Sequence, residues 1–181
     1  LISLPPSLTV PLAQTTTLPV QISTPAPVGG AVVKVVSSDP AIARPAVDSV
    51  IIAAGTSSVN ATIEGLALGT VTFTASNPNY AQDVSTVRVA AELAFTATTA
   101  AANATFGGVA TVRLESGGTP VAAPAGGIAL SYTSRDATCA VAPATGTIDA
   151  GLVSTNAALS YGGTAALPCS TRIVVSGPIG F

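Results

Sequence analysis

Pro27-Val-Gly-Gly30 followed by Ala31-Val-Val-Lys-Val-Val-Ser-Ser-Asp39 occurs a second time in this chain, as Pro124-Ala-Gly-Gly127 followed by Ile128-Ala-Leu-Ser-Tyr-Thr-Ser-Arg-Asp136. A later segment also repeats, since Gly69-Thr-Val-Thr-Phe-Thr-Ala-Ser76-Asn-Pro78 matches Cys169-Ser-Thr-Arg-Ile-Val-Val-Ser176-Gly-Pro178. Segments that recur in the same order indicate two copies of one structural unit. We therefore predict two domains, residues 1–91 and residues 92–181, in this chain of 181 residues.

Both copies alternate apolar and polar residues with a period of two, the pattern of strands that bury one face. No stretch repeats apolar residues at helical spacing, and turns rich in Gly and Pro separate the strands. The predicted fold is all-β, with two tandem antiparallel β-sandwich domains arranged end to end across a very short linker near Glu92. The residues expected to point inward include Leu18, Val20 and Ile22 with their repeat partners Ala110, Val112 and Leu114, and Ala31, Val33 and Val35 with Ile128, Leu130 and Tyr132.

Pro19 interrupts one of these strands. Proline has no N–H, so it removes a ladder donor between Leu18 and Val20. We expect the missing donor to face an open edge or a bulge.

The composition provides unusually little charge. Charged residues make up 8% of the chain, and the net charge is −2, whereas ordinary globular proteins contain roughly 25% charged residues. Basic residues are scattered and aromatic residues are few, so we exclude nucleic acid as a partner. The mean hydropathy is +0.63, but no run reaches the roughly 18 to 20 apolar residues of a membrane-spanning helix. This composition favours an extracellular or assembled protein.

The chain contains no histidine. This excludes Ser-His-Asp and Cys-His nucleophilic sites, the usual zinc sites and the commonest general base near neutral pH. The carboxylates form no Asp-x-Asp or Asp-x-Asn cluster of the kind that binds calcium. Asp39 and Asp136 stand at matching turn positions, where we expect each side chain to accept backbone hydrogen bonds. We predict no catalytic residue, no metal and no cofactor.

Both cysteines, Cys139 and Cys169, lie in the second copy. On the alignment of the two copies, Cys139 falls just after the third strand and Cys169 at the start of the sixth, positions that can be neighbours in a sandwich. We predict a disulfide between them, with two unpaired buried thiols as the alternative. A bridge across a loop of about 30 residues would contribute on the order of 3 to 4 kcal/mol. It would also indicate an oxidising compartment.

Asn60-Ala-Thr62 and Asn103-Ala-Thr105 are N-glycosylation sequons. We expect Asn60 on an outward strand face and Asn103 in a loop, so both are accessible candidate sites for modification. Chance occurrence in a chain rich in threonine is the alternative.

Three stretches follow one another in the first copy. The first is the Pro-x-Gly-Gly strand ending in Ser-Ser-Asp-Pro-Ala-Ile-Ala43, the second is Ser49-Val-Ile-Ile-Ala-Ala-Gly-Thr56, and the third is Gly65-Leu-Ala-Leu-Gly-Thr-Val-Thr-Phe-Thr-Ala75. Together they resemble bacterial Ig-like repeats, which occur in tandem in large surface proteins, adhesins and some phage structural proteins. The resemblance covers most of residues 7–90 and, more loosely, residues 93–181. It implies Ig-like sandwich domains and, by analogy alone, a surface function.

The second copy ends before any counterpart of Val84-Ser-Thr-Val-Arg-Val89, which we interpret as the closing strand of the first copy. A domain without that strand leaves its neighbouring strand with unpaired backbone groups along one side. Two explanations stay open: the polypeptide continues past Phe181, or a neighbouring subunit donates the strand. The candidate open edge consists of Thr171, Arg172, Ile173, Val174 and Val175.

These patterns favour a non-catalytic structural module of an extracellular surface rod, fibre or adhesin. Its expected partners are further copies or domains of the same protein, joined by strand pairing at the open edge. Two alternatives stay open. One is a module that binds carbohydrate or another surface protein through loops at one sandwich end, and the other is an Ig-like domain of a phage structural protein.

Overall fold

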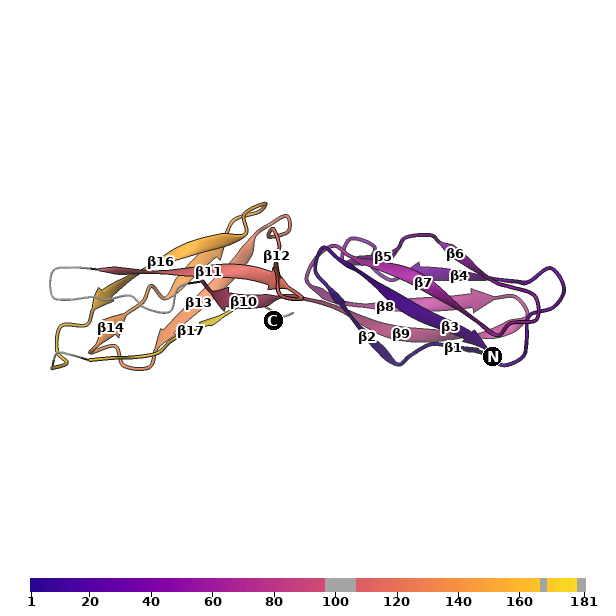
Figure 1. Ribbon diagram of the computed structural model, residues 1–181, viewed down its shortest axis with the longest axis horizontal. Coiled ribbons are helices and arrows are strands. Elements are labelled where there is room, and N and C mark those ends of the chain that lie inside the picture. The colour runs from indigo at the N-terminus through magenta and orange to yellow at the C-terminus, as the bar shows by residue number, and fades with distance from the viewer. Residues whose placement is uncertain (97–106, 167–168, 179–181) are drawn as a thin grey trace. The chain divides into compact units, whose positions relative to one another are not determined.

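A computed structural model describes residues 1–96, 107–166 and 169–178, and the regular structure of these residues consists of β-strands (Figure 1). The chain divides into two compact units: unit 1, Leu1–Ala90, and unit 2, which begins at Ala91. The boundary predicted from the sequence lies one residue later. Each unit is an all-β sandwich, as the alternation of apolar residues predicts.

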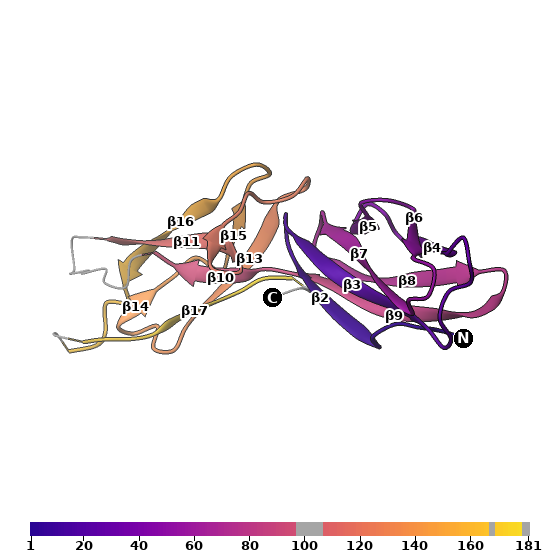
Figure 2. The ribbon, with the colours of Figure 1, turned by 45° about the vertical axis from the view of Figure 1, so that its right-hand side comes forward.

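Unit 1 is built from two sheets (Figures 1 and 2). The buried apolar side chains of the two sheets form one core. Its strands are β1 (Ile2–Ser3), β2 (Ser7–Pro11), β3 (Thr15–Ile22), β4 (Ala31–Ser37), β5 (Ala43–Pro45), β6 (Ser49–Ile52), β7 (Ser58–Gly65), β8 (Gly69–Asn77) and β9 (Tyr80–Ala90). One sheet has the order β1-β3-β7-β5 and the other the order β2-β9-β8-β4-β6. These correspond to the A-B-E-D sheet and the G-F-C sheet of an immunoglobulin-like sandwich.

The period-two pattern decides which side chains enter this core. Residues that alternate along β3, β4 and β8 are buried, and Lys34 is exposed between two buried valines of β4. Phe73 is fully buried, and burying such a side chain contributes about 1.5 to 3 kcal/mol. The predicted inward positions are confirmed in unit 1 for Leu18, Val20, Ile22, Ala31, Val33 and Val35.

One strand pair in unit 1 is parallel. β2 runs alongside β9, with Ser7 opposite Thr86 and Pro11 opposite Ala90. β9 therefore lies between β2 and β8, and its residue Val87 is fully buried. This enclosed strand is the one for which the second copy of the sequence shows no counterpart.

Pro19 occupies a place where no ladder donor is needed. The Ser23 N–H donates to the carbonyl of Leu1, on the β1 side of β3. Because N–H groups alternate between the two sides of a strand, the nitrogens of Gln21 and Pro19 point to the same side. β1 pairs as far as Gln21 and ends there, so Pro19 faces the open position that we expected.

Unit 2 repeats this plan in the residues that are described (Figure 2). Its strands are β10 (Glu92–Phe95), β11 (Gly108–Ser116), β12 (Thr119–Pro120), β13 (Ile128–Ser134), β14 (Ala140–Val141), β15 (Thr145–Ile148), β16 (Ser154–Tyr161) and β17 (Ile173–Ser176). The sheet β10-β11-β16-β14 corresponds to β1-β3-β7-β5, with β12 paired beside β11. The sheet β15-β13-β17 corresponds to β6-β4-β8.

The two units pair their central strands in the same register. Lys34 of β4 lies opposite Ser76 of β8. Ser131 of β13, the repeat partner of Lys34, lies opposite Ser176 of β17, the repeat partner of Ser76. The alignment of the two sequence copies is therefore also a structural alignment, and residues of unit 2 can be compared with their counterparts in unit 1.

We expect Phe73→Ala to destabilise unit 1 by about 3 to 5 kcal/mol, because it removes a buried ring and leaves a cavity. Amide hydrogen exchange read by mass spectrometry should show faster exchange in peptides from unit 1 and unchanged exchange in peptides from unit 2. Thr72→Ala, at an exposed position on the same strand, is the control and should change stability by less than about 1 kcal/mol. Equal effects of the two substitutions would contradict the assigned packing.

Candidate functional site

β17 lies at the edge of its sheet. It pairs with β13 from Ile173, opposite Ser134, to Ser176, opposite Ser131. Within the described part of unit 2, no strand pairs with its other side. In unit 1 the corresponding side of β8 is paired with β9. We call this other side of β17 the outer edge.

The backbone groups that face the outer edge follow from one hydrogen bond. The Arg135 N–H donates to the Arg172 carbonyl, on the β13 side, at 3.0 Å. Because successive residues of a strand point their backbone groups to opposite sides, Ile173 and Val175 direct their N–H and C=O groups away from β13. These are the groups that an added strand would pair with.

The predicted edge is only partly a strand. β17 begins at Ile173, whereas Thr171 and Arg172 precede it without strand pairing. The physical reason is visible in unit 1, where β4 pairs with β8 from Phe73 onward and residues 69–72 of β8 pair with β9. Without a described neighbour on that side, the counterparts of these residues have no ladder to join.

The inward side chains of β17 are incompletely covered. Phe73 and Ala75 of β8 are 0% exposed, whereas their repeat partners Ile173 and Val175 are half-buried. Val87 of β9 is itself fully buried in unit 1, so that strand covers apolar side chains in addition to pairing with the backbone. An aliphatic strand beside β17 would bury Ile173 and Val175 further.

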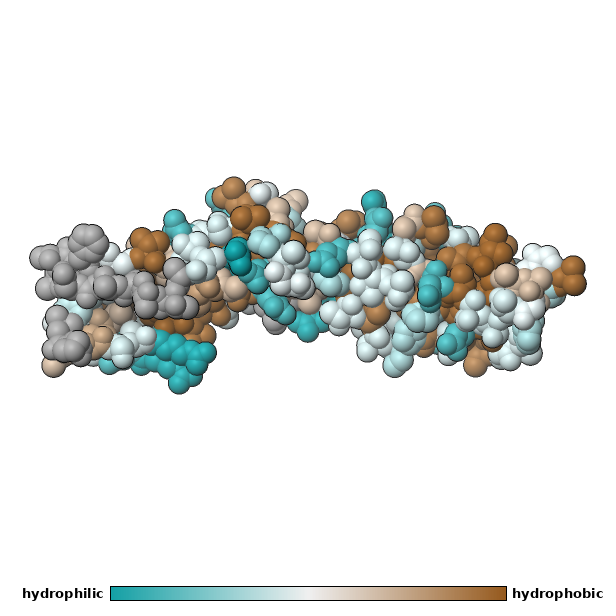
Figure 3. Space-filling view, in the orientation of Figure 1, coloured by the Kyte–Doolittle hydropathy of each residue, from teal (hydrophilic) through white to brown (hydrophobic). Residues whose placement is uncertain are grey.

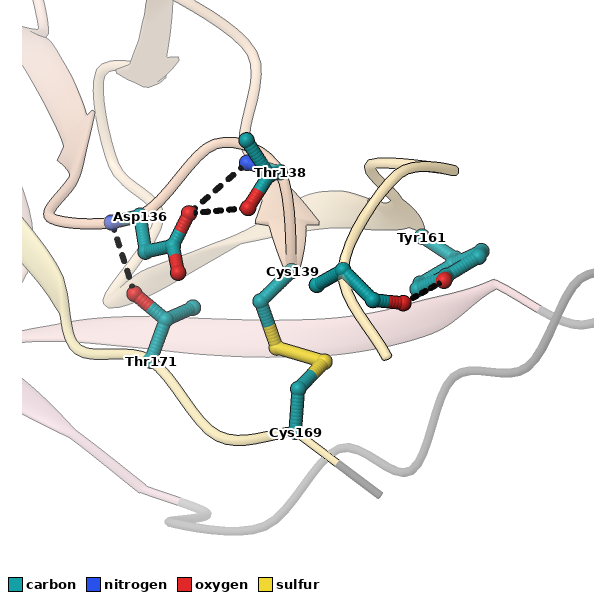
Figure 4. The surroundings of a disulfide bond; sticks show 7 residues. Asp136, Thr138, Cys139, Tyr161, Cys169 and Thr171 are labelled. Atoms are coloured by element: carbon teal, nitrogen blue, oxygen red, sulfur yellow. Dashed lines mark hydrogen bonds between the residues drawn. A yellow bond between two sulfur atoms is a disulfide. The ribbon is translucent and has the colours of Figure 1, made fainter. Parts of the chain in front are cut away.

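The predicted disulfide is confirmed (Figure 4). Cys139 and Cys169 are bonded, with Cα atoms 5.9 Å apart and a sequence separation of 30 residues. Their repeat partners in unit 1 are Ile42 and Gly69, and a Cβ atom at Gly69 would lie 2.9 Å from Ile42 Cδ1. The same two positions are therefore neighbours in both units, through packing in one and through a covalent bond in the other.

Asp39 and Asp136 stabilise the same turn in the two units, as predicted. The Ala41 N–H donates to Asp39 Oδ1 at 3.0 Å, and the Thr138 N–H donates to Asp136 Oδ1 at 2.9 Å. The Thr138 hydroxyl also donates to Asp136. This bond, and then the bond from the Thr138 N–H, lower the pKa of the Asp136 carboxyl below its ordinary value, because they favour the charged form.

Tyr132 of β13 is buried, and its hydroxyl has no hydrogen-bond partner in the described structure. Its ring lies over Gly146 of β15, where a Cβ atom would approach Tyr132 Cε2 to 2.9 Å. A large residue on β13 thus requires a small one on β15. Burial raises the pKa of the Tyr132 phenol above its ordinary value, because the phenolate would lose contact with water.

An open groove of about 910 Å³ lies on unit 1. It is formed by the segment between β3 and β4, by β4 itself and by the hairpin that joins β8 to β9. The Asn77 side chain stabilises the hairpin, since its Nδ2 donates to the Val32 carbonyl at 2.7 Å and its Oδ1 accepts from the Asn79 N–H at 2.8 Å. The sequence pattern predicts turns for the two connecting segments and a strand for β4, and it does not indicate a groove. The lining residues are Pro25, Pro27, Gly30, Ala31, Val32, Lys34, Ser76, Asn77, Pro78, Asn79 and Tyr80.

One of the two sequons, at Asn60, lies within the described residues. Asn60 lies exposed on β7, in agreement with the strand pattern. Asn103 lies outside the described residues. Glycosylation at either position stays a prediction.

On the face shown in Figure 3, few side chains are strongly hydrophilic, and these are separated by weakly polar and apolar ones. Residues 1–96, 107–166 and 169–178 contain no group of three or more His, Cys, Asp or Glu side chains placed to bind a metal ion. Across the same residues, no helix is long and apolar enough to span a membrane.

No protein-family model matches this chain, and no curated protein matches it. The D0-D1 domain of intimin resembles it with 16% identity and a TM-score of 0.40, covering 96% of this chain and 88% of that one. The D00-D0 domain of intimin does so with 14% identity and a TM-score of 0.37, covering 100% and 94%. Domains 5-6 of the S-layer protein SbsC do so with 14% identity and a TM-score of 0.36, covering 99% and 96%. Likenesses this distant establish no family, and the fold assignment rests on the strand order given above.

We expect Tyr132→Phe to leave unit 2 as stable as the wild type at neutral pH, or more stable by up to about 1 to 2 kcal/mol, because it removes a buried hydroxyl without a described partner. The two proteins should differ further in alkali. Because the pKa of Tyr132 is raised on folding, the stability contributed by its neutral form is present below about pH 10 and is lost as the pH rises through the folded-state value. Urea unfolding followed by the methyl NMR signals of unit 2 measures both effects, and equal alkaline losses would contradict the assignment.

Proposed function

We propose that this chain is a non-catalytic structural module of an extracellular surface rod, fibre or adhesin, built from bacterial Ig-like repeats. The main observation behind the proposal is the outer edge of β17, which has no strand beside it in the described residues, whereas β9 fills this place in unit 1. The module joins its neighbour when an extended strand adds to this edge.

The covalent chemistry and the composition support a location outside the cell. Disulfides persist in oxidising compartments and are rare in the cytosol, and unit 2 contains one. Charged residues make up 8% of the chain, so much of the surface interacts with water through hydroxyl and backbone groups. Weak charge repulsion between copies favours close packing in an assembly.

Unit 1 provides a template for the incoming strand. β9 runs antiparallel to β8, with Val87 opposite Val71 and Ser85 opposite Phe73. By the shared register, the strand that completes unit 2 runs antiparallel to β17 and places one of its residues opposite Ile173. Its alternate side chains face the core, so small and medium-sized aliphatic residues at every second position suit it.

A peptide with the sequence of residues 83–90, Asp-Val-Ser-Thr-Val-Arg-Val-Ala, tests this proposal. We expect it to bind the oxidised protein in isothermal titration calorimetry and to slow amide exchange at Ile173 and Val175. The control peptide carries Val87→Pro, which removes a ladder donor and should weaken binding at least about tenfold. If the peptide neither binds nor changes exchange at β17, the proposal is wrong.

Two proline substitutions in the protein give a matched comparison. Val175→Pro removes an N–H that faces the outer edge and leaves the donors toward β13 in place. We expect this variant to keep exchange protection in the β13–β17 ladder and to lose peptide binding. Val174→Pro removes a donor toward β13 and should lose both. Peptide binding by the Val175→Pro variant at wild-type strength would count against the assigned edge.

The mass of the native polypeptide identifies the source of the strand. A mass well above 17.5 kDa, with a matching strand in the same polypeptide, would place the source within the chain. If the native protein has a mass of 17.5 kDa and binds the peptide, the source of the strand would be a neighbouring subunit.

A second candidate function is the binding of carbohydrate or of another surface protein by the groove of unit 1. The observation that favours it is the presence of Tyr80, Lys34 and Asn79 in one groove, which combines an aromatic ring with polar groups that can orient a ligand. Glycan arrays test it, because binding should be lost in Tyr80→Ala and kept in Val175→Pro. Absence of glycan binding by the wild type would rule out the carbohydrate form of this function.

A further inference from the structure

The segment that leads into β17 lacks the support that its counterpart receives in unit 1. Residues 69–71 of β8 pair with residues 87–89 of β9, and β4 joins β8 only from Phe73 onward. β9 therefore positions the first part of β8. The counterpart in unit 2, residues 169–172, has no strand pairing.

Contacts with the turn that follows β13 hold this segment (Figure 4). One contact is covalent and two are hydrogen bonds. They are the Cys139–Cys169 disulfide, the bond from the Asp136 N–H to the Thr171 hydroxyl at 2.9 Å, and the bond from the Arg135 N–H to the Arg172 carbonyl at 3.0 Å. The last of them also occurs in unit 1, where the Ser38 N–H donates to the Thr72 carbonyl at 2.9 Å.

We infer that the Cys139–Cys169 disulfide provides, in unit 2, the positioning that β9 provides in unit 1, by holding β17 against β13 while the outer edge is unpaired. This inference rests on the proposed function, because it concerns the same edge. The comparison of the two units supports it. Ile42 and Gly69 occupy the same two positions in unit 1, where β9 is present and no covalent bond joins them.

The ladder and the side chains of β17 give this strand limited protection against local opening. Its ladder with β13 consists of four residue pairs, and Ile173 and Val175 are half-buried. Strands with few buried contacts open at low free-energy cost, and a bridge across 30 residues restricts the opened state. Reduction by a dithiol breaks the S–S bond, yields two thiols and oxidises the reductant to its own disulfide. The outer edge of β17 is therefore ordered in the oxidised protein, and β17 opens more readily after reduction.

Amide exchange in the full chain tests the inference. The double variant Cys139→Ile with Cys169→Gly introduces the residue pair of unit 1. We expect its β17 amides to exchange at least about tenfold faster than those of the oxidised wild type, and wild type reduced with dithiothreitol to match it. The β13–β15 ladder, which includes Ile128 opposite Ile148, is the internal control and should keep its wild-type rates.

Two results would overturn the inference. Unchanged exchange at β17 would show that the bridge does not position this strand, and equal acceleration in the β13–β15 ladder would show that it stabilises the whole unit instead.

The peptide of residues 83–90 separates this inference from the proposed function. It should restore β17 protection in the double variant, because a strand and the disulfide position the same segment, and failure to do so would count against the inference. Failure of the peptide to bind the oxidised wild type would refute strand addition and would leave the exchange comparison to decide the function of the disulfide.

Discussion

The pairing of β4 with β8, repeated by β13 with β17, is the interaction on which both sandwiches depend. It places Lys34 opposite Ser76 in one unit and Ser131 opposite Ser176 in the other. Side chains alternate between the faces of a strand, so a slip of one residue would turn the buried aliphatic residues toward solvent. β6 pairs with β4 in unit 1, and β15 pairs with β13 in unit 2. In both units this third strand lies on the side of the central strand away from β8 or β17. Unit 2 keeps this central pair and its opposing sheet, which explains why it retains a sandwich core.

Sequence reasoning could predict the features that depend on local pattern. Tyr132 is buried because it occupies an inward position of an alternating strand, and Asp136 accepts hydrogen bonds because its turn recurs from unit 1. The start of β17 could not be predicted this way. The alignment of the two copies matches Thr171 and Arg172 with strand residues of β8, but a strand requires a neighbour, and neighbours are set by the whole sheet. The groove was missed for a similar reason, since Pro27 and Tyr80 come together only through the fold.

β9 positions β8 in unit 1, and the Cys139–Cys169 disulfide positions β17 in unit 2, but the two differ in how much apolar surface they cover. β9 pairs with the backbone of β8 and also covers its apolar side chains, as the complete burial of Phe73 shows. The Cys139–Cys169 bridge fixes the position of the chain and covers little apolar surface, which leaves Ile173 and Val175 half-buried. In the proposed strand addition, the driving force would be the burial of these side chains and the pairing of the outward N–H and C=O groups.

The parallel alignment of β2 with β9 has a mechanical consequence for unit 1. Ser7 lies opposite Thr86 and Pro11 opposite Ala90, so β2 comes near the beginning of the unit and β9 at its end. Tension along the polypeptide pulls Ser7 and Ala90 in opposite directions, parallel to the strand axes. The backbone hydrogen bonds between the two strands are then loaded together in shear, and they must rupture collectively instead of peeling apart one at a time. Forced unfolding is governed by the height of such a barrier, and this geometry raises it without any addition to the equilibrium stability of the unit.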